Sequence, residues 1–459
     1  MTASQFNWNT TGPPIFPSAV TTIGGVTYTG VTCTTTTPCA VIALDQNLRI
    51  PFTAEWNTDV QHAITNNLTI DVAYVGNHAF NMYSRNDANQ PAFGFGWNNP
   101  IAASPFNGLS PAALCVSNST FSNCLANKTI TAAVTANEVA GRPYSQFPYL
   151  NYITLEKNEW HSSYNGLQIS VRERASHGLT FLASYTHDRA LDFSNGGGWA
   201  GPYSQDAYDV SHDYGPGGLD VKNRFTFQTS YNLPGRKSPG QLLEGWTVNG
   251  VVLLQGGIPW YPQDTTSDIQ GTGEYADSNS AAAQYWNYSG PAAAFTSHPS
   301  NIPCFGNLAG CTPYVSNTPP QACVTAAEAP YNGNAQLQAL ALTALTNLGC
   351  YVQGAGILTP PAYGTFGNAF RGIFHAPPFY NVDFSVFKDW RFRERLTAQF
   401  RAEVFNLFNR VDVAVPNVID PEKGLGFGCS CQTIDAAGGD TVFGAGGART
   451  IQLGLKFIF

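Results

Sequence analysis

The stretch from Tyr380 to Asn409 constrains the fold more than any other part of this sequence. Apolar residues recur at every second position, first from Tyr380 to Val386 and again from Leu396 to Val404, with polar residues between them. Strict alternation is typical of a strand with one apolar and one polar face, and two such runs joined by a short charged turn predict an antiparallel hairpin. The chain ends on a third alternating run, Ile451 to Phe459.

A soluble sheet would also alternate, but two details of the alternation favour a membrane barrel. The apolar face is rich in Phe and Tyr, as the aromatic girdles at a membrane interface require. The opposite face carries Asp, Arg, Glu and Gln, which suit a water-filled lumen better than the core of a sandwich. We therefore predict an all-β chain that forms an antiparallel transmembrane β-barrel.

The composition fits a membrane barrel and excludes some functions. Charged residues make up 11% of the 459 residues, against about 25% in soluble proteins, while aromatic residues reach 13%. The formal charge of −8 disfavours a nucleic-acid partner, which requires a basic surface. No run approaches the roughly 18 apolar residues of a transmembrane helix, but barrel strands show only every second residue to the lipid.

The first residues, MTASQFNWNTTGPP, have neither a basic segment nor an apolar segment and do not form a signal peptide. An exported barrel needs such a signal. Either the chain is soluble or it is a piece of a longer protein, and we expect the second.

The ten cysteines fall in close pairs within loop-like segments rich in Gly, Pro, Ser, Thr and Asn. An even number of cysteines in loops predicts disulfides in an oxidising compartment, whereas zinc binding would need C-x-x-C spacing or clustered His, which are missing. We expect disulfides for four pairs and regard the fifth, with one residue between its members, as less certain because so short a ring is strained. The pairs are Cys33/Cys39, Cys115/Cys124, Cys304/Cys311, Cys323/Cys350 and, as the short one, Cys429/Cys431.

Alternating runs divide the chain into an N-terminal loop region, residues 1–47, and a partial barrel, residues 48–459. The barrel part contains nine runs. They are Ile50–Asp59, Leu68–Tyr74, Leu167–Arg174, Leu179–Tyr185, Phe225–Leu233, Trp246–Gln255, Tyr380–Val386, Leu396–Val404 and Ile451–Phe459.

The connections between these runs alternate in length. Those after the first, third, fifth and seventh runs are short, whereas those after the second, fourth, sixth and eighth are long and include residues 78–150 and 262–376. Short periplasmic turns and long extracellular loops are the layout of an outer-membrane barrel, and all the cysteine pairs lie on the long-loop side. Two helices are expected inside the loops, one starting at Ser110-Pro111 and one over Leu337–Leu348, which Gly349 ends.

Four charged residues on the polar faces are candidates for the lumen wall: Arg172, Arg174, Arg401 and Glu403. They could contact a substrate or a plug, or they could simply solvate the wall. His161-Ser162-Ser163 and His187-Asp188 look like fragments of acid–base sites, but we interpret them as polar residues at strand ends. We therefore expect no catalytic residues, no metal site, no cofactor and no enzyme activity.

Several segments resemble one family. The run YNGLQISVRERASHGLTFLASYTHDRALD (164–192) resembles a repeated hairpin of the Oar-like TonB-dependent outer-membrane receptors. Its later strands are similar to DVKNRFTFQTSYNLP (220–234), GWTVNGVVLLQGGIPW (245–260) and FRAEVFNLFNR (400–410), and a further hairpin to WNTDVQHAITNNLTIDVAYVGNHA (56–79). The terminal Phe459 also fits the C-terminal aromatic residue of outer-membrane barrels, which serves as an assembly signal.

The resemblance implies a 22-stranded barrel with a plug in its lumen, of which this chain holds the last part. The plug, the TonB-contacting segment and the carboxypeptidase-regulatory-like domain of such receptors are missing here. The implied partners are outer-membrane lipid, the upstream plug and remaining barrel of the same protein, the TonB complex acting through that plug, and the assembly machinery acting through the C-terminal strand. The implied location is the cell outer membrane.

The implied function is binding and uptake of a bulky substrate through the plugged barrel. Two alternatives stay open: a structural or adhesive surface protein anchored by the barrel, and a secreted soluble β-protein that binds carbohydrate.

The two edge strands of the predicted sheet give a test of the fold. The first and last strands run in the same direction, so we expect an open curved sheet, or a strained small barrel with one parallel seam.

Overall fold

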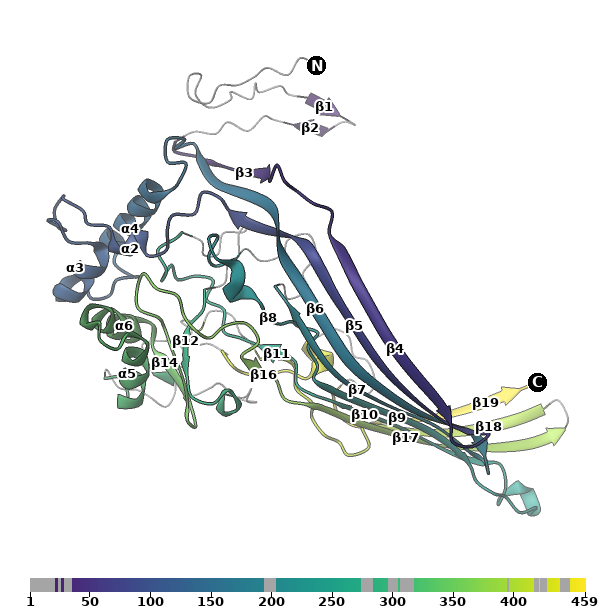
Figure 1. Ribbon diagram of the computed structural model, residues 1–459. Coiled ribbons are helices and arrows are strands. Elements are labelled where there is room, and N and C mark those ends of the chain that lie inside the picture. Colours follow the sequence, from purple (N-terminus) through teal and green to yellow (C-terminus); the bar gives the residue numbers. More distant parts are fainter. Residues whose placement is uncertain are drawn as a thin grey trace.

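The computed structural model describes residues 21–23, 26–28, 35–193, 204–273, 284–295, 304–305, 318–393, 396–416, 421, 427–437 and 446–459. Nine long strands form one antiparallel path in chain order (Figure 1), and they confirm the nine predicted runs. They are β4 (Phe52–Ala63), β5 (Leu68–Asp87), β6 (Leu150–Ser176), β7 (Leu179–Asp192), β9 (Asn223–Asn232), β10 (Trp246–Gln255), β17 (Phe379–Arg393), β18 (Leu396–Phe405) and β19 (Thr450–Ile458).

The strand register sorts the side chains into two faces. Directly paired residues lie on the same face of a sheet, so a row of partners can be followed from strand to strand. One row is apolar on seven strands: Val60, Val72, Ile169, Tyr185, Phe225, Leu254 and Tyr380. A row of opposite parity is polar on six strands: Thr180, Ser230, Asn249, Ser385, Glu403 and Gln452. We call the two sides the apolar face and the polar face.

Lys388 is the one buried cation on the apolar face of the described strands, and it lies close to the short turn before β10. Its Nζ donates hydrogen bonds to the carbonyl oxygens of Glu244 at 2.6 Å and of Asp389 at 2.8 Å. The ammonium also lies over the rings of Trp246 and Trp390, 5.7 and 4.7 Å from their centroids. A lysine near the end of an apolar face buries its stem in this way while its head finds polar partners.

Strands β5 and β6 are much longer than the alternation predicted. The loop expected over residues 78–150 is wrong at its start, where β5 continues to Asp87, whereas β6 begins at Leu150. The pairing of the two strands continues from Tyr83 opposite Asn158 to Asp87 opposite Thr154. This part of β5 reads YSRND, with no apolar alternation. The hydrogen-bonded ladder needs no apolar face, so the strand persists where the sequence pattern that predicts it has ended.

The expectation of loop throughout residues 1–47 is also wrong. Two three-residue strands, β1 (Thr21–Ile23) and β2 (Val26–Tyr28), pair with each other. A longer strand, β3 (Cys39–Leu44), pairs in parallel with the first residues of β6. Its sequence, CAVIAL, is apolar throughout, so it lacks the alternation on which the sequence reading relied.

The long connections carry the helices, which gather at one end of the sheet in Figure 1. The two expected helices are confirmed as α3 (Pro111–Ser117), where the Ser110 hydroxyl accepts from the Ala113 amide, and α6 (Ala335–Leu348), which ends at Gly349 with φ 82°. The sequence reading missed α4 (Lys128–Gly141) and α5 (Gln321–Glu328). The shorter elements are α2 (Phe95–Asn98), α7 (Ile434–Ala437), η1 (Ser119–Phe121), η2 (Val210–Asp213), η3 (Pro239–Gln241), η4 (Ala292–Ala294), η5 (Ala329–Tyr331), β8 (Gly215–Pro216), β11 (Pro259–Trp260), β12 (Asn287–Ser289), β13 (Cys304–Phe305), β14 (Cys350–Gln353), β15 (Gly356–Thr359) and β16 (Phe374–His375).

The main hydrophobic core lies in these loops and not in the sheet. One cluster of buried residues takes Trp97 and Ile130 from the connection between β5 and β6, Trp286 and Leu345 from that between β10 and β17, and Phe427 from that between β18 and β19. Three connections that are far apart in sequence therefore pack as one body above the strand ends. Burial of large apolar side chains in this body makes it a rigid platform.

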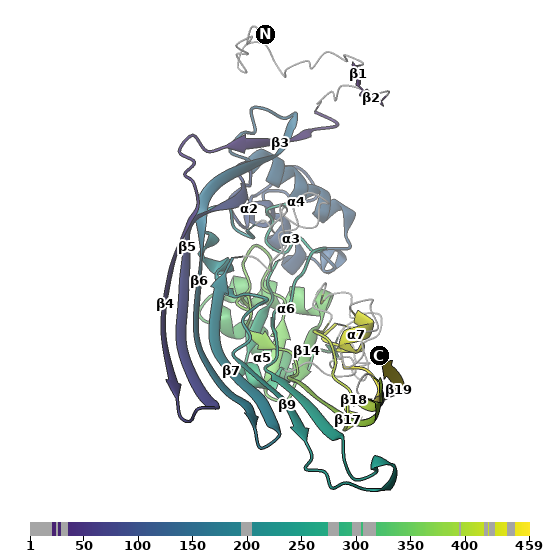
Figure 2. The same cartoon turned by 90° about the vertical axis from the view of Figure 1, so that its right-hand side faces the viewer.

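The sheet is open, which is the first of the two expected outcomes. Its path ends at β4 on one side and at β19 on the other, and these two strands do not pair. Figure 2 shows the curvature, with β4 and β19 at opposite edges and the loop body held between them at one end. No helix in the described part of the chain is both long and apolar enough to cross a membrane.

Candidate functional site: a basic cavity at the loop end of the sheet

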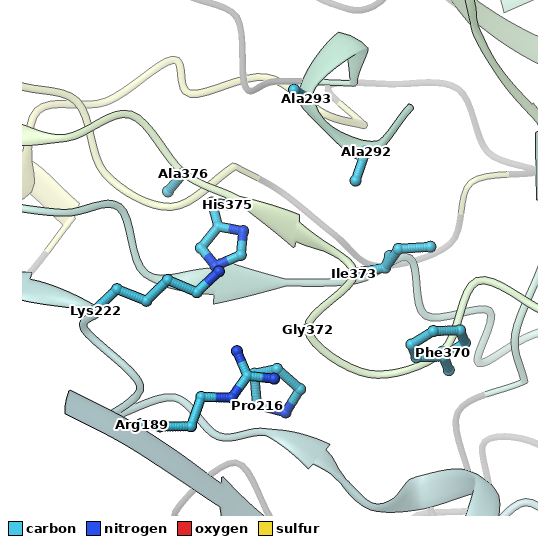
Figure 3. Close-up of a pocket in the computed structure, with 10 residues that line it drawn as sticks. All are labelled: Arg189, Pro216, Lys222, Ala292, Ala293, Phe370, Gly372, Ile373, His375 and Ala376. Carbon is cyan, nitrogen blue, oxygen red and sulfur yellow. The ribbon is translucent and has the colours of Figure 1, made fainter. Parts of the chain in front are cut away.

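A cavity of about 580 Å³ lies where the end of β7 meets the segments that lead into β9 and β17. Figure 3 shows its lining, with the side chains of Arg189, Lys222 and His375 converging on one side and Phe370 and Ile373 on the other. The remaining lining residues are Pro216, Ala292, Ala293, Gly372 and Ala376. We call this site the basic cavity.

The two cations reach the basic cavity because their strands are neighbours. Arg189 lies near the end of β7 and Lys222 immediately precedes β9, and His187 pairs with Asn223 as the last rung between these strands. The guanidinium Nη1 of Arg189 is 3.8 Å from Oδ2 of the buried Asp220, beyond hydrogen-bonding distance, and the Arg189 side chain is 49% exposed. Among the described residues, Lys222 has no ion-pair partner.

His375 contributes a polar atom without a partner. It lies in β16, which pairs with β11, and its Nε2 is buried and makes no hydrogen bond within the described structure. Burial lowers the pKa of His375, the positive charges of Lys222 and Arg189 lower it further, and Asp220 opposes them. The imidazole is therefore neutral near pH 7 and can either donate or accept a hydrogen bond at this nitrogen, depending on its tautomer.

A buried ion pair fixes the wall that carries His375. The guanidinium of Arg371 bonds to the carboxylate of Asp192 at 2.5 Å and to its carbonyl oxygen at 3.3 Å, and the Arg371 side chain is 2% exposed. Gly215 allows this approach, since a Cβ there would lie 2.8 Å from the Arg371 carbonyl oxygen. Gly372, with φ +67°, packs against Pro216 in the same way.

Buried carboxyl groups tie the loops together around the cavity. Asp213 accepts hydrogen bonds from the hydroxyls of Ser204 and Tyr285, and burial raises its pKa above the ordinary value. Glu138 of α4 faces Asp268, and burial together with the Asp268 carboxylate raises the pKa of Glu138 to about 10. These groups already have partners inside the loop body, so they position the loops and do not line the basic cavity.

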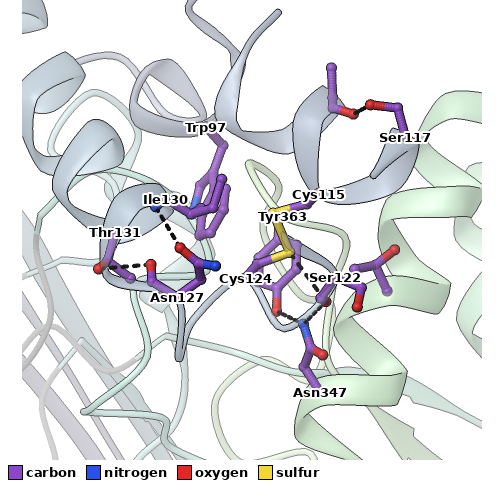
Figure 4. The surroundings of a disulfide bond; sticks show 12 residues. Trp97, Cys115, Ser117, Ser122, Cys124, Asn127, Ile130, Thr131, Asn347 and Tyr363 are labelled. Atoms are coloured by element: carbon purple, nitrogen blue, oxygen red, sulfur yellow. Dashed lines mark hydrogen bonds between the residues drawn. A yellow bond between two sulfur atoms is a disulfide. The ribbon is translucent and has the colours of Figure 1, made fainter. Parts of the chain in front are cut away.

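Disulfides close some of the loops. The structure contains Cys115–Cys124, Cys323–Cys350 and Cys429–Cys431. Figure 4 shows the first of them beside Trp97 and Tyr363, whose rings stack at 4.4 Å, while the Asn347 amide donates to the Tyr363 hydroxyl. Cys39 and Cys304 are also disulfide-bonded; the cysteines proposed as their partners, Cys33 and Cys311, lie outside the described residues.

The charged residues predicted for the lumen wall do not form a site. Arg172, Arg401 and Glu403 have the parity of the polar face, and the Arg401 guanidinium lies 4.8 Å from the centroid of the Phe387 ring. Arg174 lies at a shift in strand register, where its amide bonds to the Asn67 carbonyl oxygen. Phe459 follows β19 and is 91% exposed. The four charged residues lie as two pairs on β6 and β18, which are not neighbours in the sheet.

The sequence reading missed the residues of the basic cavity. It singled out His187-Asp188 as polar residues at a strand end, and the next residue, Arg189, is the one that lines the cavity. Lys222 could have been placed beside Arg189 from the pairing of two consecutive predicted strands. His375 and Phe370 come from within a connection of more than a hundred residues, for which no sequence signal gives the fold.

The arrangement suits binding and not acid–base chemistry. The basic cavity combines two cations, a neutral imidazole and an apolar wall, and its lining contains no Ser, Thr, Cys, Asp or Glu. Within the described part of the chain, no group of three or more His, Cys, Asp or Glu residues could hold a metal ion. A cavity of this size and lining can hold a small organic solute.

Comparison with known proteins gives a family. The sequence matches the family model described as an outer membrane beta barrel domain over residues 2–452. A comparison with curated proteins gives no match. One similar solved structure is the ferric-catecholate import receptor Fiu from Escherichia coli K12, with a TM-score of 0.34 and 9% identity over 94% of this chain and 29% of that one. A second is the outer membrane transporter YddB from Escherichia coli, with a TM-score of 0.33 and 9% identity over 92% of this chain and 33% of that one. A third is the ferric preacinetobactin receptor BauA from Acinetobacter baumannii, with a TM-score of 0.34 and 7% identity over 89% of this chain and 29% of that one. The chain therefore spans about a third or less of the length of these structures.

Proposed function

Since this chain belongs to the family of outer membrane beta barrel domains, we propose that it forms the C-terminal wall and outer loops of an Oar-like TonB-dependent receptor that binds and takes up a bulky solute. The outer membrane is the compartment in which the chain works. The alternative of a secreted soluble β-protein is therefore wrong.

One observation carries the proposal: an apolar row runs across seven paired strands and a polar row of opposite parity runs across six. An apolar face continuous over seven paired strands suits contact with lipid, and a polar face suits a wet lumen. A barrel built only as an anchor would need no wide polar interior. The loop body with its own core and its basic cavity adds a binding surface at one end.

The remaining parts of the receptor are proposed partners of this chain. Strands upstream of the chain would pair with the free edges of β4 and β19 and close the barrel, and a plug would fill the lumen. The TonB complex would act on that plug. The C-terminal strand, ending at Phe459, would be recognised by the outer-membrane assembly machinery, and the apolar face would contact outer-membrane lipid.

In this mechanism the loops hold the solute and the plug controls its passage. The outer loops, braced by their disulfides, provide a preformed surface on which a solute is retained. Displacement of the plug then opens a path along the polar face, where residues such as Arg401 and Glu403 keep the wall wetted. The chain itself contributes binding and a path, and the energy comes through the plug.

The proposal is tested by energy-dependent depletion of solutes. Cells that express the full-length receptor are incubated with a complex growth medium, and the solutes that disappear are compared between a strain with active TonB and one with TonB inactivated. We expect at least one solute to be depleted only when both the receptor and TonB are present. If no solute depends on TonB while cell adhesion depends on the receptor, the protein is a surface adhesin instead.

A further inference from the structure

We propose that the basic cavity binds an organic anion: a solute with a carboxylate, phosphate or sulfate group attached to an aromatic or aliphatic body. The inference rests on the proposed function, because it names the class of solute that the outer loops of the receptor would hold. It follows from three properties of the cavity, which are its positively charged lining, an unpartnered polar atom and an apolar wall.

The positive charge of the cavity exceeds the negative charge that faces it. Arg189 and Lys222 line the cavity, and Asp220 is the carboxylate beside them, in a loose pair with Arg189 at 3.8 Å. A second nearby carboxylate, Asp192, is held by Arg371 at 2.5 Å. A third, Asp188, whose amide bonds to the Lys222 carbonyl oxygen, lies near Asp220 and does not line the cavity. The lining itself therefore presents two cations and no carboxylate. A guanidinium fork together with an ammonium group is a combination that binds carboxylate and phosphate oxygens.

The unpartnered Nε2 of His375 is the second sign of a ligand. A buried polar atom without a hydrogen bond destabilises a protein, so such atoms are usually paired in the functional state. The nitrogen is buried at a cavity that Lys222 and Arg189 also line. A rotation of the imidazole would present this enclosed nitrogen to the cavity, where an oxygen of a bound anionic group would supply the missing partner.

The apolar wall explains why the ligand is organic and not a simple ion. Phe370 and Ile373 lie on the other side of the cavity from the cations in Figure 3, and Phe370 is 52% exposed although it is a large aromatic residue. Ala292 and Ala293 add further apolar surface. A free phosphate ion would leave this wall hydrated, whereas an aromatic or aliphatic body would cover it.

Two sources can supply this chemistry. The ligand could be a soluble organic anion from the medium, or the acidic headgroup of a lipid in the surrounding membrane, because the cavity lies near the ends of strands that cross that membrane. Both present an anionic group on an apolar body. The experiment therefore uses a soluble probe in membranes with and without acidic lipid.

The full-length receptor is placed in phosphatidylcholine nanodiscs and titrated calorimetrically with naphthyl phosphate, inorganic phosphate and naphthol. We expect naphthyl phosphate to bind about tenfold or more tightly than either of the others. The variants Arg189→Gln and Lys222→Gln should each weaken its binding about tenfold. Phe370→Ala should weaken naphthyl phosphate without changing the affinity for inorganic phosphate, and Lys237→Gln, in the turn at the opposite end of the sheet, is the matched control.

Nanodiscs of phosphatidylglycerol identify the source. Loss of naphthyl phosphate binding there assigns the cavity to a lipid headgroup, and unchanged binding assigns it to a soluble solute. Equal affinity in the wild type and in the Arg189→Gln/Lys222→Gln double variant, or equal affinity for naphthol, would overturn the inference. Binding without TonB-dependent uptake would contradict the proposed function alone, and uptake that the double variant leaves intact would contradict the inference alone.

Discussion

Glu138 holds its proton at neutral pH, since burial raises its pKa from 4.5 to about 10. Its neighbour Asp268 accepts hydrogen bonds from the amides of Gly271 at 2.9 Å and Thr272 at 3.2 Å. A protonated Glu138 can therefore donate to the Asp268 carboxylate, and this contact joins α4 to the loop that follows β11. Ionisation of Glu138 would place two carboxylates side by side in a buried site.

The first prediction is a pH dependence of this contact. A group whose folded pKa is raised contributes stability that is complete below its unfolded pKa and is lost as the pH rises through its folded value. The loop body should therefore lose stability between about pH 4.5 and about pH 10. Hydrogen exchange at the amides of Gly271 and Thr272, corrected for the intrinsic rate, measures the loss. Glu138→Gln should flatten the dependence, and an unchanged profile in this variant would refute the assignment.

The second prediction concerns the ion pair between Arg371 and Asp192, whose side chains are 2% and 30% exposed. Removing one partner of a buried pair leaves the other charge unpaired and costs about 3–5 kcal/mol, and the exposure of Asp192 places this pair at the lower end. Arg371→Met should thus release the segment before β17 to proteolysis. The double variant Arg371→Met/Asp192→Asn should recover part of the loss; no recovery would show that packing alone is responsible.

At the scale of elements, the third prediction separates the two faces of the sheet. Phe227 lies on the apolar face between Ala183 and Val252, and Ser230, on the same strand, lies on the polar face between Thr180 and Asn249. Phe227→Arg should destabilise folding into lipid by about 2–4 kcal/mol if the residue lies near mid-membrane. Ser230→Arg should cost much less. Equal effects in a urea titration of folding into lipid vesicles would mean that both faces are buried.

The fourth prediction concerns the disulfide between Cys323 of α5 and Cys350 of β14, 27 residues apart. In the chain-entropy model, closing a loop of this length contributes about 3 kcal/mol. Mass spectrometry of the non-reduced protein should find the linked peptides. The Cys323→Ser/Cys350→Ser variant should loosen the loop body and leave the strands intact, so hydrogen exchange should rise in α6 and not in β10. A free thiol at either position in the exported protein would contradict the pairing.

Strands could be predicted from the sequence where one of their faces contacts lipid and the other contacts water. The nine strands were found because lipid and water impose opposite side-chain types on alternate positions. The contrast between apolar and polar positions disappears beyond the membrane, where the last residues of β5 and the first residues of β6 do not alternate. The same contrast is absent in β3, which is apolar throughout. The helices α3 and α6 carry capping signals at Ser110 and Gly349. The basic cavity was not predictable, since Arg189 and His375 meet only through the fold of a long connection.

At the scale of the whole molecule, the free edges of β4 and β19 determine how the chain behaves alone. An unpaired strand edge in hydrocarbon costs several kcal/mol per unsatisfied group, and an apolar edge in water promotes aggregation. The fifth prediction is that the chain expressed alone aggregates, whereas the full-length protein migrates as a heat-modifiable species on gels. A monodisperse, heat-modifiable monomer of this chain in detergent would show that it needs no further strands.

The length of β6 has a consequence for what can reach the protein. Its apolar face begins at Leu167, so residues 150–166 of the strand continue beyond the lipid-facing part. At about 3.3 Å per residue this continuation is on the order of 50 Å long, and its ladder with β5 makes it stiffer than a single chain. The helices at its end are thus displayed well clear of the bilayer. A large solute that approaches from outside would meet these helices before it reached the strands at the membrane surface.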